Sequence, residues 1–401
     1  MQLTIPQVGE NEELGAAVEE FGKFLDREVR PRARKHDGSM LEKPQLQALW
    51  DLIRPYGIGT GLVPTEQGGL GLGYLASGAL YEKLSEVWAD IAIATVPHEA
   101  ATLKILAGAT DEFKAANVPD LIAGRKIACS AISEPQAGSN IREIKTRARA
   151  TANGYVITGE KIWISNVPIA DIVLTLAKTR DDELTIFAVD TSAKGITRRN
   201  IPTLGFDAAP FGSIHYDEVE VPASSIVGGL GGGRKVTMHG FERVRIFAAV
   251  MGNGIAAAAL ELAIDYAKTR QQFGYTIGAF QLVQQTIAEM ATLHEAARLL
   301  TYRALAKIEQ GIPCGHEAAM AKAYATEAAV KIASSAIQPH GSMGISREFE
   351  LEHLFRSARM LLIPDGTTHI NQLIIARGLL GIDAFRPKPP AAAGKWPTAA
   401  D

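Results

Sequence analysis

The sequence has little of what would build a disulfide framework, a membrane span or a nucleic-acid interface. Two cysteines, Cys129 and Cys314, occur in 401 residues, which is too few for a disulfide scaffold and agrees with the reducing cytoplasm. Lys and Arg number 41 against 44 Asp and Glu, and no basic run dominates a segment, so we expect no nucleic-acid partner. Charge or glycine interrupts the apolar stretches before membrane-spanning length, and residues 1–6 lack the basic start of an export signal. We therefore expect a cytoplasmic protein without membrane contact.

Motifs for metal binding and for several kinds of catalysis are also missing. The nine histidines are scattered, without His-Glu-x-x-His or cysteine pairs at metal-ligand spacing, so we expect no metal site. Gly341-Ser342-Met343-Gly344 lacks the spacing of a nucleophile elbow. The glycine-rich stretches 68–73 and 228–233 match no phosphate-binding fingerprint, and we interpret them as a turn and a linker. Cys129 lies in an apolar run and is predicted to be a small buried residue rather than a nucleophile.

Hydrophobic periodicity divides the chain into a helical part, a β part and a second helical part. From about residue 11 to 124, apolar residues recur at helical spacing. The period then shifts toward two, and long Ala-rich helices with two apolar faces follow, which favours a bundle with subunit contacts. We predict a mainly α fold with a β insert, divided into a helical domain at 1–125, an antiparallel β domain at 126–232, a helical bundle at 233–385 and a disordered Pro/Ala-rich tail at 386–401.

The β part contains short runs rich in β-branched and aromatic residues. They are residues 155–157, 173–176, 184–189 and 214–221. Asn153-Gly154 and Asp181-Asp182 are predicted hairpin turns between them.

Two segments of the β part could form the wall of a cofactor site. Residues 128–140 read ACSAISEPQAGSN, and residues 159–166 read GEKIWISN. Backbone N–H groups and serine hydroxyls can reach the edge of a flat, polar heteroaromatic ring while the indole of Trp163 packs against its face. Either segment alone would more often be an ordinary hairpin or loop, but here they occur together, between helical blocks.

Both segments resemble the signature segments of the acyl-CoA dehydrogenase family. Two further motifs match in order: residues 266–274 with Phe280-Gln281, and residues 338–341 with 365–370. The resemblance runs from about residue 11 to 384. It implies an N-terminal helical domain, a middle β domain and a C-terminal four-helix bundle, with FAD as cofactor and a homodimer or homotetramer as the assembly.

The resemblance also implies which residues bind the cofactor and the substrate. Residues expected to contact the flavin of their own subunit are Ile132, Ser133, Ser139, Trp163 and Ser165. Residues expected to hold the pyrophosphate and adenosine of a neighbour's FAD are Arg270, Phe273, Gln281, Gln338 and Gly341, with Thr367 and His369 near the diphosphate. Ser139 and Arg243 are expected near the substrate. The chain departs from the family pattern at Ser342, where a glycine is common, and at His369, where Gln or Glu is common.

The family reaction needs a carboxylate that removes the α-proton of an acyl thioester while the β-hydrogen leaves as hydride to flavin N5. Most members carry Glu where this chain has Asp365, and a side chain about 1 Å short can cost on the order of 10²-fold in rate. A minority projects Glu from the first bundle helix, where this chain has Glu242. We therefore predict Glu242 as the base, with Asp365 as the second candidate and Arg243 keeping the carboxylate ionised. Taken alone, Glu242 could be a helix-capping residue and Asp365 a turn residue.

Three functions remain open at this stage. The first is FAD-dependent α,β-dehydrogenation of an acyl-CoA or acyl-carrier-protein thioester, with an electron-transferring flavoprotein as acceptor. The second is a flavin oxidase or monooxygenase of the same fold, although Gln372 and Leu373 stand where a nitroalkane-oxidase-like chain has an Arg. The third is a non-catalytic assembly factor. Acyl chain length depends on residues near Val96, His98, Glu99 and 248–251, and the sequence does not determine it.

Overall fold

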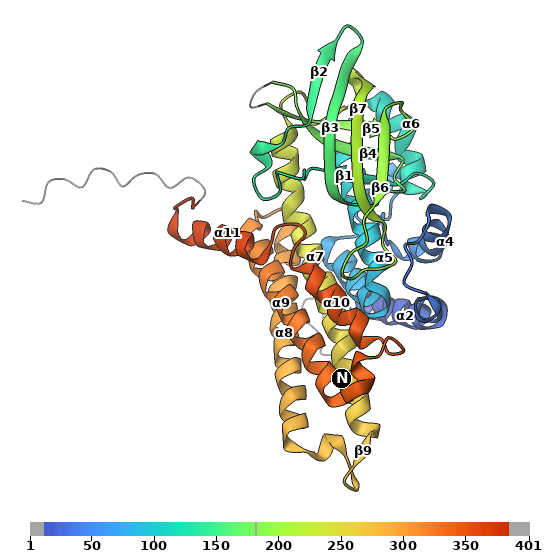
Figure 1. The fold of residues 1–401 in the computed structure, drawn as a ribbon, viewed down its shortest axis with the longest axis vertical. Coiled ribbons are helices and arrows are strands. Elements are labelled where there is room, and N and C mark those ends of the chain that lie inside the picture. Colours follow the sequence, from blue (N-terminus) through green and yellow to red (C-terminus); the bar gives the residue numbers. More distant parts are fainter. Residues whose placement is uncertain (1–11, 181–182, 385–401) are drawn as a thin grey trace, which may run out of the picture.

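The structure is a computed structural model, and it describes residues 12–180 and 183–384. The order of parts agrees with the prediction: helices, then a sheet, then a helical bundle (Figure 1). The predicted turn Asp181-Asp182 and the predicted tail 386–401 lie outside the described residues. The domain boundaries after residues 125 and 232 remain our proposal.

The helices of the N-terminal part pack around α5. They are α2 (Glu12–Glu28), α3 (Arg30–Lys35), α4 (Lys43–Ile53), α5 (Tyr74–Gly108) and α6 (Asp111–Ile122). In α2, Phe21 and Leu25 are fully buried, as their helical spacing predicted. Helix α5 is buried along most of its length because it packs against α2, against the sheet and against the bundle. It therefore carries side chains to the place where all three parts meet.

The middle part is one mixed sheet. Its strands are β1 (Ala128–Ala131), β2 (Arg147–Thr151), β3 (Gly154–Ser165), β4 (Ile172–Lys178), β5 (Leu184–Asp190), β6 (Ile196–Asn200), β7 (Phe211–Pro222) and β8 (Ile226–Val227). The order is β6-β7-β3-β2-β4-β5-β8, with β1 on β4. Every predicted β run lies in a strand, and the predicted Asn153-Gly154 turn is confirmed because Thr151 pairs with Gly154 across it.

The prediction of a purely antiparallel sheet is wrong at β4. Strand β1 pairs with β4 in parallel, and Arg147 of β2 pairs with Lys178 of β4 in parallel. The chain leaves β1, forms the β2–β3 hairpin and only then returns to β4, so β1 and β4 run in the same direction. A crossover of this length leaves no turn signal for a sequence pattern to detect.

The C-terminal part is a bundle of long helices. They are α7 (Gly233–Thr269), α8 (Gln281–Glu309), α9 (Gly315–His340) and α10 (Leu351–Leu361), followed by α11 (Thr368–Leu380). The first four pack on one another, which confirms the predicted four-helix bundle. A small hairpin of β9 (Gln271–Gln272) and β10 (Tyr275–Thr276) joins α7 to α8 at the end of the bundle far from the sheet (Figure 1).

Within the described residues, α7 is long and apolar enough to cross a membrane by length and composition. However, 72% of its apolar window is buried inside the protein. Helix α7 packs against α5, α8, α9 and α10. Its composition therefore matches that of a core helix.

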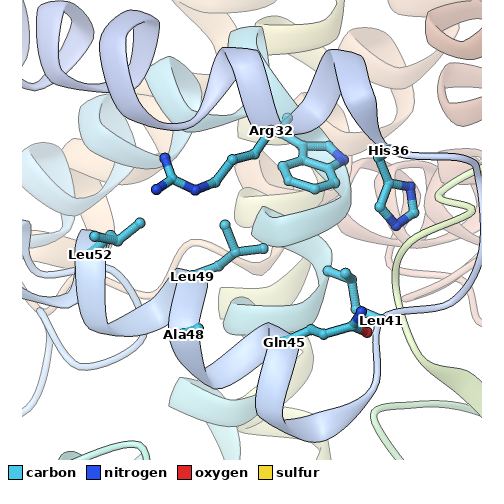
Figure 2. A pocket seen from close by; sticks show the side chains of 8 residues that line it. Arg32, His36, Leu41, Gln45, Ala48, Leu49 and Leu52 are labelled. Atoms are coloured by element: carbon cyan, nitrogen blue, oxygen red, sulfur yellow. The ribbon is translucent and has the colours of Figure 1, made fainter.

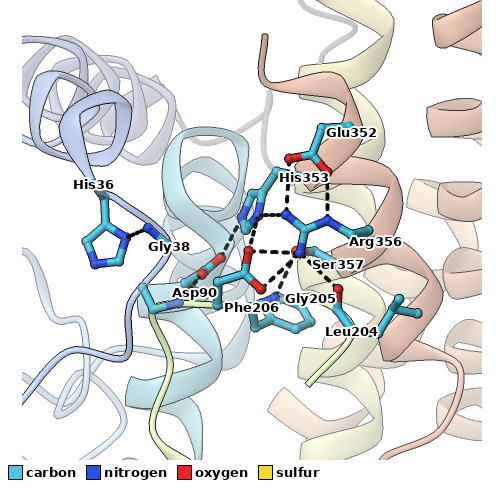
Figure 3. A network of polar contacts seen from close by, with 12 residues as sticks. His36, Gly38, Asp90, Leu204, Gly205, Phe206, Glu352, His353, Arg356 and Ser357 are labelled. Atoms are coloured by element: carbon cyan, nitrogen blue, oxygen red, sulfur yellow. Dashed lines mark hydrogen bonds and ion pairs between the residues drawn. The ribbon is translucent and has the colours of Figure 1, made fainter. Parts of the chain in front are cut away.

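A polar network fastens α10 to α5 and to the loop between β6 and β7 (Figure 3). His353 Nε2 lies 3.0 Å from Asp90 Oδ1, and Arg356 Nη1 lies 2.8 Å from Asp207 Oδ2. The backbone N–H of Ala208 donates to the other Asp90 oxygen at 2.9 Å. Because β7 begins directly after this loop, the network fixes the sheet relative to the bundle.

Candidate active site

The structure brings the two predicted wall segments together. The backbone N–H of Ile162 donates to the carbonyl of Ser133 at 3.0 Å, so the segment after β1 lies along β3. Lys161 Nζ donates to the Ile132 carbonyl at 2.9 Å and to Glu134 Oε1 at 2.8 Å. The Lys161–Glu134 ion pair is completely buried, and its hydrogen bonds fix the two segments against each other. Ile132 and Ser133, in the segment after β1, therefore lie beside the end of β3 that contains Trp163 and Ser165.

Trp163 has an unusual backbone conformation. The pairing of β3 with β7 shifts register between Ile162 and Ile164, and Trp163 has a φ of 64°. A bulge with left-handed backbone at a bulky residue is strained, and such strain concentrates at functional sites. The indole is 56% exposed, beside the partly exposed hydroxyl residues Ser133 and Ser165. An exposed indole beside hydroxyls and backbone N–H groups fits a flat, polar ring. Ser139 lies exposed in the loop after β1.

The second set of predicted cofactor residues lies around the end of the bundle that is far from the sheet (Figure 1). Arg270, Phe273 and Gln281 surround the β9–β10 hairpin, and Gln338 and Gly341 lie at the end of α9, next to the end of α7 through the stacked rings of Tyr266 and His340. All five are exposed, and Phe273 is 89% exposed. The hairpin and the sheet are at opposite ends of the long axis (Figure 1). We therefore expect the second set to reach the cofactor of a neighbouring subunit, as the resemblance to the family implied.

Asp365 sits on a strained, well-anchored turn between α10 and α11. Its φ is 57° and that of Gly366 is 95°. Lys322 Nζ donates to the carbonyls of Leu362 and Gly366, both at 2.9 Å. Asn371 Nδ2 donates to the Gly366 carbonyl at 2.7 Å, and Arg245 Nε donates to the Asp365 carbonyl at 3.3 Å. The backbone of the turn is therefore held from both sides.

The charge environment of Asp365 suits a proton acceptor. Burial raises the pKa of its carboxyl above the ordinary value, and the positive charges of Lys322, Arg245 and Lys104 oppose that rise. The predicted partner Arg243 is not among these cations. Instead, Arg243 Nε donates to the Tyr74 hydroxyl at 2.9 Å, and its guanidinium lies over the Tyr74 ring. Sequence reasoning missed Lys104, Arg245 and Lys322 because isolated cations in helices usually face solvent.

Glu242 lies in the third turn of α7, so the alternative that it caps this helix is wrong. Its carboxylate is close to the start of α9, where a Cβ added at Gly315 would come within 2.8 Å of Glu242 Oε1. The negative charges of Glu242 and Asp365 both act on Arg245. The charges of the two predicted carboxylates therefore act on the same guanidinium, although Glu242 comes from α7 and Asp365 from the turn between α10 and α11.

Thr367 and His369 are at the start of α11. The Thr367 hydroxyl accepts the Ile370 N–H at 3.3 Å and caps the helix. The His369 side chain is exposed. Their predicted role near the diphosphate remains a prediction.

A cavity of about 10 Å³ lies next to Arg243 and is lined also by Leu62, Val96 and Glu99. Burial raises the pKa of the Glu99 carboxyl to about 7. His98 does not line this cavity. His98 Nε2 donates to the Leu121 carbonyl and Nδ1 accepts the Ala128 N–H, both at 3.1 Å, so this ring joins α6 to β1. Because burial lowers the pKa of His98 to about 4, the ring is neutral.

A larger cavity of about 350 Å³ is remote from these residues. It lies between α3 and α4 beside Trp88 of α5 (Figure 2). None of the predicted site residues lines it. Within the described residues, no group of three or more His, Cys, Asp and Glu side chains could hold a metal ion. Cys129 is buried as predicted, and burial raises the pKa of its thiol to about 12.

Comparisons with known proteins agree with this architecture. Three family models match in order: the N-terminal domain of acyl-CoA dehydrogenase at residues 11–125, its middle domain at 129–219 and its C-terminal domain at 231–380. The chain belongs to the acyl-CoA dehydrogenase family. An acyl-CoA dehydrogenase of Bacillus subtilis (strain 168) is 35% identical over 325 residues, which cover 80% of this chain and 86% of that protein.

Solved structures of other proteins have the same fold, and some of them contain a bound substrate or FAD. A glutaryl-coenzyme A dehydrogenase in complex with glutaryl-CoA superposes with a TM-score of 0.88 at 29% identity, covering 97% of this chain and 99% of that one. PigA with FAD and proline superposes with a TM-score of 0.85 at 28% identity, covering 94% and 99%. The protein is an FAD-dependent oxidoreductase of the acyl-CoA dehydrogenase type, which acts on CH–CH bonds of acyl-CoA thioesters.

Proposed function

We propose that this chain desaturates an acyl thioester between Cα and Cβ, with Glu242 as the base that removes the α-proton. Bound FAD would accept the β-hydrogen as hydride. The observation that carries the proposal is that the charges of two carboxylates, Glu242 and Asp365, both act on one guanidinium, that of Arg245. A base must lie within hydrogen-bonding reach of the proton that it removes, and cations near it keep it ionised.

Asp365 is the second candidate for the base, and its pKa favours it. A general base works best when its pKa approaches the working pH, and burial moves the pKa of Asp365 in that direction. Its anchored, strained turn would also hold the carboxylate in one place. Against Asp365 stands its short side chain, since a small gap between base and substrate costs much rate.

Other residues would position the reactants. Trp163 with Ser133 and Ser165 would hold one face and edge of the flavin, and donors that stabilise the developing enolate oxygen would come from the Asp365 turn. Arg270, Phe273, Gln281, Gln338 and Gly341 would reach the FAD of a neighbouring subunit. We therefore propose a homo-oligomer in the cytoplasm, with an electron-transferring flavoprotein as electron acceptor and either CoA or a carrier protein holding the acyl group.

Anaerobic reduction of the flavin tests the base. The purified yellow protein is mixed with a panel of acyl-CoA and acyl-carrier thioesters, and loss of the flavin absorbance is followed. Glu242→Gln is expected to abolish bleaching, because it removes the proton acceptor without changing its size. Asp365→Asn is expected only to slow it. The opposite pattern transfers the role of base to Asp365.

Two further outcomes would contradict the dehydrogenase proposal. Rapid reoxidation of the reduced flavin by O₂ would indicate an oxidase or monooxygenase of the same fold. A folded protein that is colourless and takes up no FAD would indicate a non-catalytic assembly factor. Slow reoxidation together with bleaching by an acyl thioester supports the proposal.

A further inference from the structure

Lys104 lies where the three parts of the molecule meet. It comes from α5, it is partly buried, and its Nζ donates to the hydroxyl of Ser130 on β1 at 3.0 Å. Ser130 is two residues before Ile132, so this contact is next to the predicted flavin wall. On its other side Lys104 packs against α7, where a Cβ added at Gly240 would come within 2.7 Å of Lys104 Cε. The lysine side chain is therefore confined by α5, β1 and α7.

The positive charge of Lys104 faces other charges of the site. Arg243 and Asp365 are both near enough to change its pKa. Lys322 and Arg245, the other cations near Asp365, donate to backbone carbonyls of the turn and so have acceptors. Lys104 and Arg243 instead donate to the neutral hydroxyls of Ser130 and Tyr74.

Lys104 and Arg243 are neighbouring cations that both donate to neutral hydroxyls. The carboxyls that face them are Asp365 near Lys104 and Glu99, which lines a cavity with Arg243. Among the described residues neither Lys104 nor Arg243 makes an ion pair with a carboxylate. Like charges that are close together and partly buried repel each other and lose solvation, unless an anion lies near both. Burial and the charge of Arg243 accordingly lower the pKa of Lys104 to about 8, against the opposing effect of Asp365. An anionic ligand would relieve this repulsion.

We propose that Lys104 and Arg243 bind a negatively charged group on the acyl part of the substrate, so that the chain selects acyl groups that carry a carboxylate. This inference rests on the proposed dehydrogenation of acyl thioesters, because it assigns the ligand to the acyl group. A carboxylate would accept hydrogen bonds from both cations, and charge-assisted hydrogen bonds of this kind are stronger than neutral ones. Lys104 then acts as a specificity-determining residue.

A matched pair of ligands tests the inference in the FAD-loaded protein. One is an ω-carboxyacyl-CoA, and the other is its ω-methyl ester, which has nearly the same shape and no acyl charge. Binding is measured by calorimetry with redox-inert thioether analogues of both, and bleaching is measured with the thioesters. We expect the carboxylate to bind about tenfold more tightly than the ester, as for a charge-assisted contact. This preference should decline as pH rises through about 8, where Lys104 loses its proton.

Variants locate the effect. Lys104→Met is expected to remove most of the preference while the affinity for the ester stays the same, and Lys104→Arg is expected to retain it. Lys235→Met, which removes an exposed charge from α7, is the control and should leave the preference intact. Equal affinity of wild-type protein for the two analogues overturns the inference without any variant.

The remaining outcomes separate this inference from the proposed function. Bleaching by the ester with no preference for the carboxylate overturns the inference and leaves dehydrogenation standing. Bleaching by no thioester overturns the proposed function, and binding of the inert analogues still decides the role of Lys104. If Lys104→Met changes the flavin midpoint potential and retains the preference, then Lys104 acts on the cofactor and the inference is wrong.

Discussion

Trp163 shows how one residue can be placed against its own conformational preference. Its backbone is left-handed at a bulge of β3, and the indole remains 56% exposed. Neither condition favours folding, since a bulky residue at positive φ is strained and an exposed indole buries little apolar area. The neighbouring strand positions hold the bulge in place, because Ile162 is bonded to Ser133 and Lys161 to Glu134. The conformation is therefore better explained by a ligand than by stability.

Trp163→Gly should change stability and cofactor retention in opposite directions. Glycine adopts positive φ freely, so relief of about 1–2 kcal/mol of strain should exceed the chain entropy that glycine loses on folding, about 0.5–1 kcal/mol, and the free energy of unfolding should rise slightly. Removal of the indole should increase the loss of FAD during dialysis by about tenfold or more, because stacking on the ring is lost. Thermal unfolding of the apoprotein and flavin fluorescence of the dialysate are the measurements. Trp163→Phe retains an aromatic face and serves as the control. A variant that loses stability and keeps its FAD would contradict this interpretation.

At the scale of elements, α10 connects the bundle to the sheet through polar side-chain contacts. His353 and Arg356 of this helix reach Asp90 of α5 and Asp207 of the loop before β7 (Figure 3). Burial lowers the pKa of His353, but the hydrogen bond to Asp90 and the charges of Asp90 and Asp207 more than offset this, so that the pKa is raised. The protonated form of His353 is therefore the one that stabilises the contacts of α10 with Asp90 and Asp207.

The stabilisation from His353 should disappear at high pH. Since its folded pKa is raised, the contribution is fully present below the unfolded value of about 6.5 and is lost as pH rises through the folded pKa. His353→Gln should lower the melting temperature by a few degrees near pH 6, corresponding to about 1–2 kcal/mol, and by much less near pH 9. Scanning calorimetry across this range checks it. His215→Gln, an exposed position on β7, should show no such trend. If the loss of melting temperature in His353→Gln grows with pH, the predicted direction of the pH dependence is wrong.

At the scale of the whole molecule, hydrophobic periodicity and turn residues predicted the order of the helical and β parts. They did not predict which distant segments contact each other. The strand runs, the Asn153-Gly154 turn and the bundle helices follow from local patterns. The parallel pairing of β1 with β4 does not, because it joins segments that are separated by a hairpin. For the same reason the cations around Asp365 were missed: Lys104 and Lys322 come from distant helices, and a single lysine gives no signal of its tertiary neighbours.

The positions of the two sets of predicted FAD-binding residues suggest that each FAD site is completed by a second subunit. The β9–β10 hairpin that follows Arg270 lies at the end of the bundle far from the sheet that contains Trp163 (Figure 1). Two variants, each with one defect, should therefore complement each other. Trp163→Gly and Arg270→Ala homo-oligomers are expected to retain little FAD. A mixed dimer of the two has one site with both defects and one with none, because a two-fold interface pairs the wall of one subunit with the hairpin of the other.

Co-expression with two different tags and purification on both isolates this mixed oligomer. Its FAD content should be about half that of the wild type, set by the ratio of intact to defective sites in a two-fold assembly. Trp163→Gly carrying both tags in separate copies is the control and should show no recovery, since every site then lacks the indole. If the mixed oligomer also remains colourless, each FAD is bound within one chain, and the exposed Phe273 and its neighbours at the bundle tip need another explanation.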